Sequence, residues 1–155
     1  MINKNLIEKS QMEWGNGIIE IGKLKQNRLK CEEYTKSFLY RMYDFNNSKE
    51  ILFKPTKAKI IQFRSSFEKA LSYFIGGENA ACSEDKGFAL EPWSKVKFEN
   101  SGFIIEDSRA IAMGNYFFTD PSGEKIKVEF SFVYKKNKEG EIKIVLHHSS
   151  IPFKA

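Results

Sequence analysis

The only two histidines of the chain stand side by side near its end, at His147 and His148, and two serines, Ser149 and Ser150, follow at once. Imidazole exchanges protons near neutral pH, because its unperturbed pKa is about 6.5, and hydroxyls both donate and accept hydrogen bonds. Residues 143–152 are otherwise typical of a buried β-strand, in which successive side chains face opposite ways. We therefore predict His147 and Ser149 on one face and His148 and Ser150 on the other. A register shift of one residue would exchange the two pairs, and one of the two faces is expected to carry the function.

Histidine also binds metals, so a metal centre is the first alternative. Adjacent histidines on a strand point apart, and a site of three histidines is excluded because the chain has only two. Cys31 and Cys82 do not have the spacing of a metal site. A mixed site with Asp or Glu stays open, although nothing in the sequence indicates one. We predict no metal and no cofactor.

The composition describes an ordinary soluble globular chain. Of its 155 residues 41% are hydrophobic and 29% charged, which is enough for one domain with a core. We predict a single domain over residues 1–155, with 1–13 as a loosely packed start of the first helix. Although the net charge is +5, the lysines alternate with glutamates, so nucleic-acid binding is disfavoured. The two cysteines favour free thiols in a reducing compartment. With no apolar signal core or membrane span, we predict a cytoplasmic protein, with a trimmed leader left open.

Apolar spacing predicts helices in the first half of the chain and strands in the second. Helical periodicity covers about 5–27 and 29–45, a short strand follows at 51–53, and a third helix runs to Gly76-Gly77, with Thr56 at its N-cap position. From Gly87 the period changes to two. The predicted strands are 87–90, 96–99, 103–119, 126–135 and 142–151, separated by turns at 100–102, 120–123 and 137–140.

Helices followed by an antiparallel meander give the α+β class. We predict a strongly curved sheet that forms a cone, with one open end, around the N-terminal helices. On the strand 126–135, one face is apolar and the other polar, which is typical of a half-solvated sheet. The apolar excess on several other strands leaves sheet surface to bury, so we predict a homodimer.

Four sequence segments together indicate which family the chain resembles. The run from His147 to Pro152 resembles the closing motif of a nuclear-transport-factor-2-like branch that includes the association domain of calmodulin-dependent kinase II. Three further segments make the chain similar to the iota-class carbonic anhydrases that work without a metal. The first is 53–58, the second is 72–77 followed by 84–89 and 92–93, and the third is 113–119. The resemblance covers residues 14–153.

The resemblance implies reversible hydration of CO2 to bicarbonate, without a cofactor, in a pocket inside the cone. Carried over by motif, the catalytic residues are Thr56, Tyr73, Ser149 and, beside it, His147, which we expect to act as base or proton relay. Weaker candidates for binding the substrate are Arg64, Tyr116, His148 and Ser150.

Each of these residues also has a purely structural interpretation. Thr56 alone would more often be a helix cap, Tyr73 a half-buried aromatic residue near a helix end, and a strand histidine a satisfied core group. His148 is assigned to sheet packing or to the dimer interface. The alternative function is a non-catalytic oligomerisation or small-ligand-binding module of the kinase association-domain type, since fold does not fix function. A third possibility, an isomerase or dehydratase, would place an acidic base in the cone, where this sequence offers mainly hydroxyls.

Overall fold

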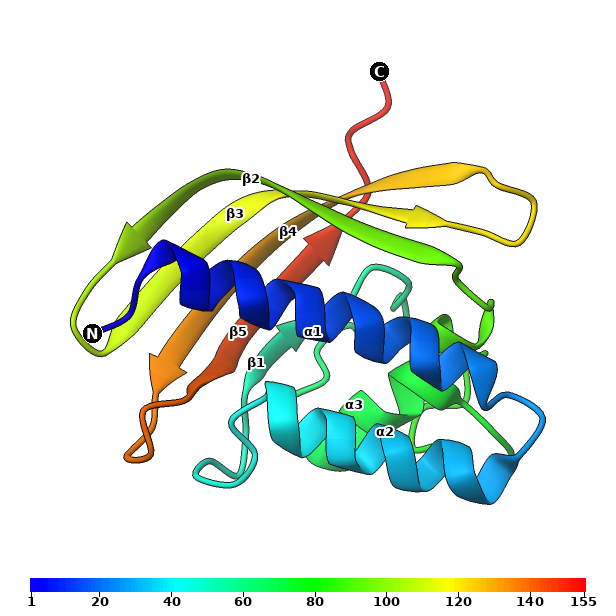
Figure 1. Cartoon of the computed structure of the whole chain (residues 1–155). Helices are drawn as coiled ribbons and strands as arrows, with labels where there is room; N and C mark the ends of the chain where they lie inside the picture. The colour runs from blue at the N-terminus through cyan, green and yellow to red at the C-terminus, as the bar shows by residue number, and fades with distance from the viewer.

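The computed structural model describes all 155 residues, as three α-helices against one face of a five-stranded sheet (Figure 1). The helices are α1 (Lys4–Lys23), α2 (Arg28–Met42) and α3 (Phe67–Ile75), and a short 3-10 helix, η1, covers Phe88–Leu90. The strands are β1 (Leu52–Lys54), β2 (Lys95–Ile105), β3 (Arg109–Thr119), β4 (Lys125–Lys136) and β5 (Ile142–Ser150). None of the helices combines the length and apolar character needed to traverse a bilayer.

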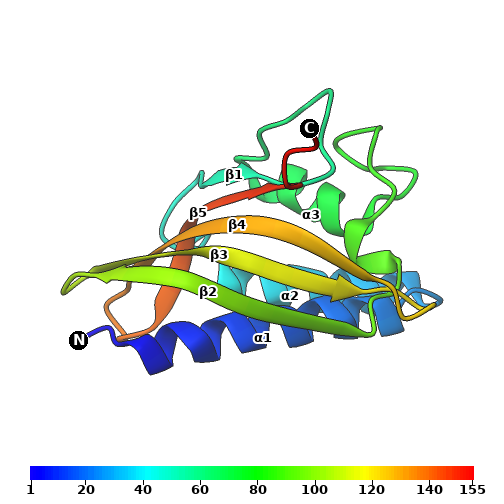
Figure 2. The same cartoon turned by 90° about the horizontal axis from the view of Figure 1, so that it is seen from above.

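The sheet has the strand order β1-β5-β4-β3-β2 and is antiparallel except for the parallel pair β1–β5. It bends strongly, remains open, and carries the helices on its concave side (Figure 2). Two register shifts contribute to the bend, one in β2 between Asn100 and Gly102 and one at the pairing of β4 with β5, because bulges increase local twist and curvature. The predicted α+β cone is therefore confirmed.

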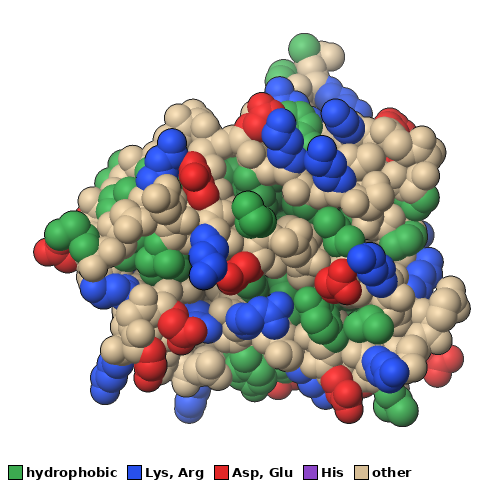
Figure 3. All heavy atoms as spheres, viewed as in Figure 1, with side chains coloured by type: hydrophobic (Ala, Val, Ile, Leu, Met, Phe, Trp, Pro, Cys, Tyr) green, Lys and Arg blue, Asp and Glu red, His purple; other side chains and the backbone are tan.

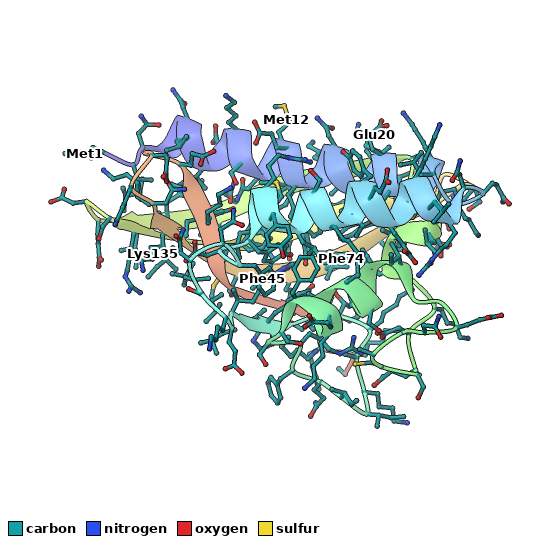
Figure 4. The ribbon with its side chains drawn as sticks, turned by 90° about the horizontal axis from the view of Figure 1, so that it is seen from below. Met1, Met12, Glu20, Phe45, Phe74 and Lys135 are labelled. Atoms are coloured by element: carbon teal, nitrogen blue, oxygen red, sulfur yellow. The ribbon has the colours of Figure 1, made fainter.

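The core lies between the concave face of the sheet and the helices. Trp14 from α1 is at its centre, and its ring lies within 6.5 Å of the rings of Phe38, Phe74 and Tyr116. Figure 4 shows Phe74 and Phe45 pointing between the helices and the sheet, whereas Met12 points outward from α1. Near the N-terminus, Ile2 and Ile7 are buried in this core.

Three local predictions are wrong. The third helix begins at Phe67, after the N-cap Ser66, whose side chain accepts a hydrogen bond from the Lys69 amide; Thr56 therefore caps no helix. The predicted strand 87–90 is the 3-10 helix, which follows Gly87 at a positive φ of 88°. The predicted turn 100–102 is a bulge inside β2, and the chain reverses at 106–108 instead.

The helix-bearing face of the surface mixes charges of both signs. Figure 3 shows Lys and Arg side chains interspersed with Asp and Glu, without a continuous basic region on this side. The arrangement follows the alternation of lysine and glutamate along the sequence.

Candidate active site

A narrow cavity lies between the concave face of the sheet and the helices. Its volume of about 10 Å³ is enough for about one water-sized molecule. Six of the ten lining residues are hydrophobic, and no charged side chain is among them. The lining residues are Trp14, Phe53, Pro55, Thr56, Tyr73, Phe74, Phe88, Tyr116, His147 and Ser149.

Strand β5 brings His147 and Ser149 to this cavity by simple alternation. Both side chains are buried, with 2% and 1% exposed, opposite Phe132 and Phe130 of β4. The predicted division of the two faces and its register are confirmed.

His148 and Ser150 face the convex side of the sheet, outside the cavity. His148 is exposed, and the Ser150 hydroxyl donates a hydrogen bond of 3.1 Å to Glu129. Neither residue lines this cavity; both line a separate pocket, together with Met113 and Ser131.

Thr56 reaches the cavity because β1 pairs in parallel with β5. Phe53 lies opposite His147 in this pairing, and the chain continues through Pro55 to bring Thr56 beside Ser149. The two hydroxyl oxygens, Thr56 Oγ1 and Ser149 Oγ, are 2.5 Å apart. The pairing thus joins two hydroxyls that are 93 positions apart in the sequence.

Tyr73 projects from α3 toward the same place. Its hydroxyl oxygen accepts a hydrogen bond of 3.2 Å from the Lys57 amide, and its ring stacks on Phe88 at 5.5 Å. Burial raises the pKa of Tyr73 above its ordinary value, so the hydroxyl keeps its proton at neutral pH. That proton remains available to an oxygen atom in the cavity.

Tyr116 lies at the centre of the site, although the sequence ranked it among the weaker candidates. Its hydroxyl donates a hydrogen bond of 2.6 Å to Ser149 Oγ and lies 3.0 Å from His147 Nε2. Burial raises the pKa of Tyr116, so this phenol is also neutral. Tyr116 connects the imidazole to the serine hydroxyl.

Arg64 is already engaged outside the cavity. Its guanidinium is fully buried and forms two hydrogen bonds with Asp85, of 2.6 and 2.7 Å, and a third of 2.7 Å with the Ile61 carbonyl. It lies 5.7 Å from the Tyr73 ring centroid, but it is not among the cavity residues. The expected contact of Arg64 with an anion is replaced by a structural ion pair.

Two residues behind the site were not singled out by the sequence. The Tyr43 hydroxyl lies 2.8 Å from His147 Nδ1, and the Trp14 indole N–H donates to the Tyr43 oxygen at 3.1 Å. Trp14 lies in the predicted helix 5–27 and Tyr43 in the predicted helix 29–45, and Tyr43 is 104 positions from His147. No local pattern could have indicated this contact.

The electrostatics of the site are those of neutral donors and acceptors. Burial lowers the pKa of His147 well below its ordinary value, because an imidazolium loses its hydration there. The imidazole is therefore neutral at pH 7. The chain contains no group of three or more His, Cys, Asp or Glu side chains placed to hold a metal ion. The arrangement suits a small, largely apolar molecule whose oxygen atoms take hydrogen bonds.

Comparison with known proteins gives consistent matches over nearly the whole chain. The family model described as metal-independent carbonic anhydrase matches residues 5–151. A metal-independent carbonic anhydrase of Nostoc sp. (strain PCC 7120) is 31% identical over 155 residues, covering 98% of this chain and 75% of the relative.

Among solved structures, a cyanobacterial iota-carbonic anhydrase complexed with bicarbonate has a TM-score of 0.93 at 30% identity, covering 99% of this chain and 94% of that one. A protein of the calcium/calmodulin-dependent protein kinase II association-domain type from Xanthomonas campestris has a TM-score of 0.61 at 20% identity, covering 92% and 82%. An NTF2-like family protein from Streptomyces avermitilis has a TM-score of 0.58 at 9% identity, covering 97% and 96%. The last two share the fold alone.

Proposed function

The chain belongs to the metal-independent carbonic anhydrase family and interconverts CO2 and bicarbonate, and we propose that the reaction takes place in the cavity where Thr56, Tyr116 and Ser149 meet. The observation that carries this location is the chain of hydroxyls inside an otherwise apolar cavity. The family model and the bicarbonate-bound relative support the same reaction, and the residues below are our own assignment.

The cavity supplies two requirements of the hydration step. Apolar walls such as Phe53, Phe74 and Phe88 suit CO2, which has no net charge, and the cavity has to widen beyond its volume of about 10 Å³ to admit CO2 and the attacking water. During the reaction a water oxygen bonds to the carbon atom, one O–H bond of that water breaks, and its proton passes to solvent water or a buffer base. Negative charge then develops on the former CO2 oxygens. Fixed donors aimed at such oxygens stabilise the transition state more than the ground state.

We assign the donors from the hydroxyls that retain a free proton. Tyr73 accepts from the Lys57 amide and so can donate its own proton into the cavity. Thr56 and Ser149 form one pair, of which one hydroxyl donates to the other and the second remains free. Thr56 and Tyr73 are therefore the proposed donors to the substrate, and Ser149 is the catalytic partner that holds Thr56 in place at the cavity.

His147 is proposed to act through Tyr116 rather than as a store for the released proton. Its lowered pKa makes the imidazole a weak proton acceptor, because a general base works best with a pKa near the working pH. Its Nε2 is linked to Ser149 by the Tyr116 hydroxyl. Through this link the imidazole polarises the hydroxyls that face the substrate.

Thr56→Val tests the location directly, since valine keeps the shape and removes the hydroxyl. We expect kcat for CO2 hydration to fall by about 100-fold, the usual effect of losing one oxyanion donor. Thr35→Val is the control: Thr35 is fully buried and Thr56 half-buried, but the Thr35 hydroxyl donates to the Cys31 carbonyl inside α2 and is not part of the cavity. Full activity in Thr56→Val, or an equal loss in both variants, would contradict the location.

A homodimer and a cytoplasmic location are further parts of the proposal. The convex sheet face exposes Ile104, Ile111 and Met113, at 61%, 38% and 57%, and these lie on neighbouring strands. A second copy covering this face would bury them. Met113→Lys should give monomers in analytical ultracentrifugation if this is the interface. The two free, buried cysteines support a reducing compartment.

A further inference from the structure

A chain of hydrogen-bonded polar side chains, the polar chain, runs along the cavity without a break from α1 to Thr56, two residues after β1. It contains an indole N–H, two phenols, an imidazole and two aliphatic hydroxyls, joined by contacts of 2.5 to 3.1 Å. In order, its members are Trp14, Tyr43, His147, Tyr116, Ser149 and Thr56. Each hydroxyl has a single proton to donate, so the direction of one bond constrains the next.

The indole fixes the first bond, because Trp14 Nε1–H can only donate. The Tyr43 oxygen therefore accepts from it, and the Tyr43 proton must find another partner. The available acceptor is His147 Nδ1, at 2.8 Å. The reverse direction, with His147 Nδ1–H donating to Tyr43, would leave the Tyr43 proton unpaired in a site that is completely buried. Such orphaned donors are costly, and only Ser10 Oγ is an unpartnered buried side-chain atom in this protein.

The direction then propagates along the remaining bonds. With Nδ1 accepting, the proton of the neutral imidazole is on Nε2 and is donated to the Tyr116 oxygen. Tyr116 donates to Ser149 Oγ. In the Ser149–Thr56 pair, 2.5 Å apart, either hydroxyl can donate, and the direction that continues the series has Ser149 donating to Thr56 Oγ1. The Thr56 proton is the last in the chain and is left for the cavity.

We propose that Tyr43, held by Trp14, is a positioning residue that fixes the Nε2–H tautomer of His147 and thereby directs the free proton of Thr56 toward the substrate. The tautomer follows from the hydrogen-bond geometry of the polar chain alone. The effect on catalysis rests, in addition, on the proposed function of Thr56. Tautomers set through a partner on the other ring nitrogen are a general feature of histidine sites.

The decisive measurement is nitrogen NMR of protein labelled with 15N-histidine, because the chain contains only two histidines. His147→Asn identifies the signals of His147. In the wild-type protein we expect a proton on Nε2 of His147 and an unprotonated Nδ1 at pH 7. A proton on Nδ1 would overturn the proposal. This result does not depend on activity, so it stands or falls separately from the proposed carbonic anhydrase site.

Tyr43→Phe then tests the positioning role. We expect His147 to populate both tautomers and kcat to fall about 10-fold or more, the usual range for partners of a catalytic group. KM should change little, because the hydroxyls in contact with the substrate remain. Tyr134→Phe is the matched control: Tyr134 is also buried, but its hydroxyl lies near Ser10 and Gln11 and is not a member of the polar chain from Trp14 to Thr56.

Two outcomes of the variant would refute the role of Tyr43. One is a Tyr43→Phe protein that keeps the pure Nε2–H tautomer and the wild-type kcat. The other is a loss of kcat of the same size in Tyr134→Phe. Circular dichroism verifies the fold of each variant, and should Tyr43→Phe fail to fold, the wild-type spectrum alone decides the tautomer.

Discussion

Removal of the Ser149 hydroxyl should damage both stability and catalysis, whereas removal of the next hydroxyl in the strand should do neither. Ser149 Oγ accepts from Tyr116 at 2.6 Å and lies 2.5 Å from Thr56 Oγ1. Ser149→Ala leaves the Tyr116 proton without this acceptor in a buried site. Ser150→Ala removes only a contact with the exposed Glu129.

The magnitudes follow from these environments. An orphaned buried donor costs about 1–3 kcal/mol, so we expect the free energy of unfolding to fall by about 2 kcal/mol in Ser149→Ala. Ser150→Ala should stay within about 0.5 kcal/mol of the wild-type value, as is usual for surface changes. The loss of the hydroxyl relay to Thr56 should lower kcat by about 100-fold, which corresponds to about 2.7 kcal/mol in the activation barrier.

Both effects can be measured on the same two variants. Urea unfolding gives the stability difference, and stopped-flow CO2 hydration with a pH indicator gives kcat and KM. The comparison is sharp because the substitutions are identical, adjacent and on opposite faces of β5. Wild-type activity in Ser149→Ala, or an equal loss in Ser150→Ala, would show that the cavity face is not the site of reaction.

Two further predictions concern stability and pH. Because burial lowers the pKa of His147, the unfolded chain takes up a proton below about pH 6.5 that the folded chain does not, so the free energy of unfolding should decrease as the pH falls. Urea unfolding at pH 7 and pH 5 should show a smaller decrease for His147→Asn than for His148→Asn; equal decreases would refute the assignment. Asp85→Asn removes the nearer of the two carboxylates beside the buried Arg64 guanidinium, leaving Glu84 at 3.8 Å, and should cost about 3 kcal/mol in urea unfolding. Glu32→Gln, which removes an exposed ion pair, should cost less than about 1 kcal/mol, and a similar cost for both would contradict the structural role of the buried pair.

The sequence was most informative where periodicity alone determines which face of a strand a side chain occupies. Alternation along β5 was sufficient to place His147 and Ser149 on the same face, and the structure shows that this face is the buried one. The polar pair His148 and Ser150 then had to face outward, since a strand has only two faces. The choice of Thr56 and Tyr73 as site residues came from the family resemblance, and both line the cavity in the structure.

The predictions failed where tertiary contacts override local signals. Thr56 follows a proline and precedes polar residues, like a helix cap, but parallel pairing of β1 with β5 holds it beside Ser149. Arg64 was predicted to bind an anion, but in the structure its guanidinium forms an ion pair with Asp85, which lies in a loop 21 positions further along the sequence. Tyr43 contacts His147 across 104 positions, so its role depends on the packing of α2 against β5 and has no sequence pattern of its own.

The most direct test of the account is CO2 hydration by chelator-treated protein with its metal content measured, comparing wild type with Thr56→Val. The account predicts that activity survives chelation in the wild-type protein and is lost in the variant. Activity that disappears on chelation and returns with one added metal, or that is unchanged in Thr56→Val, would contradict a metal-free reaction at this cavity.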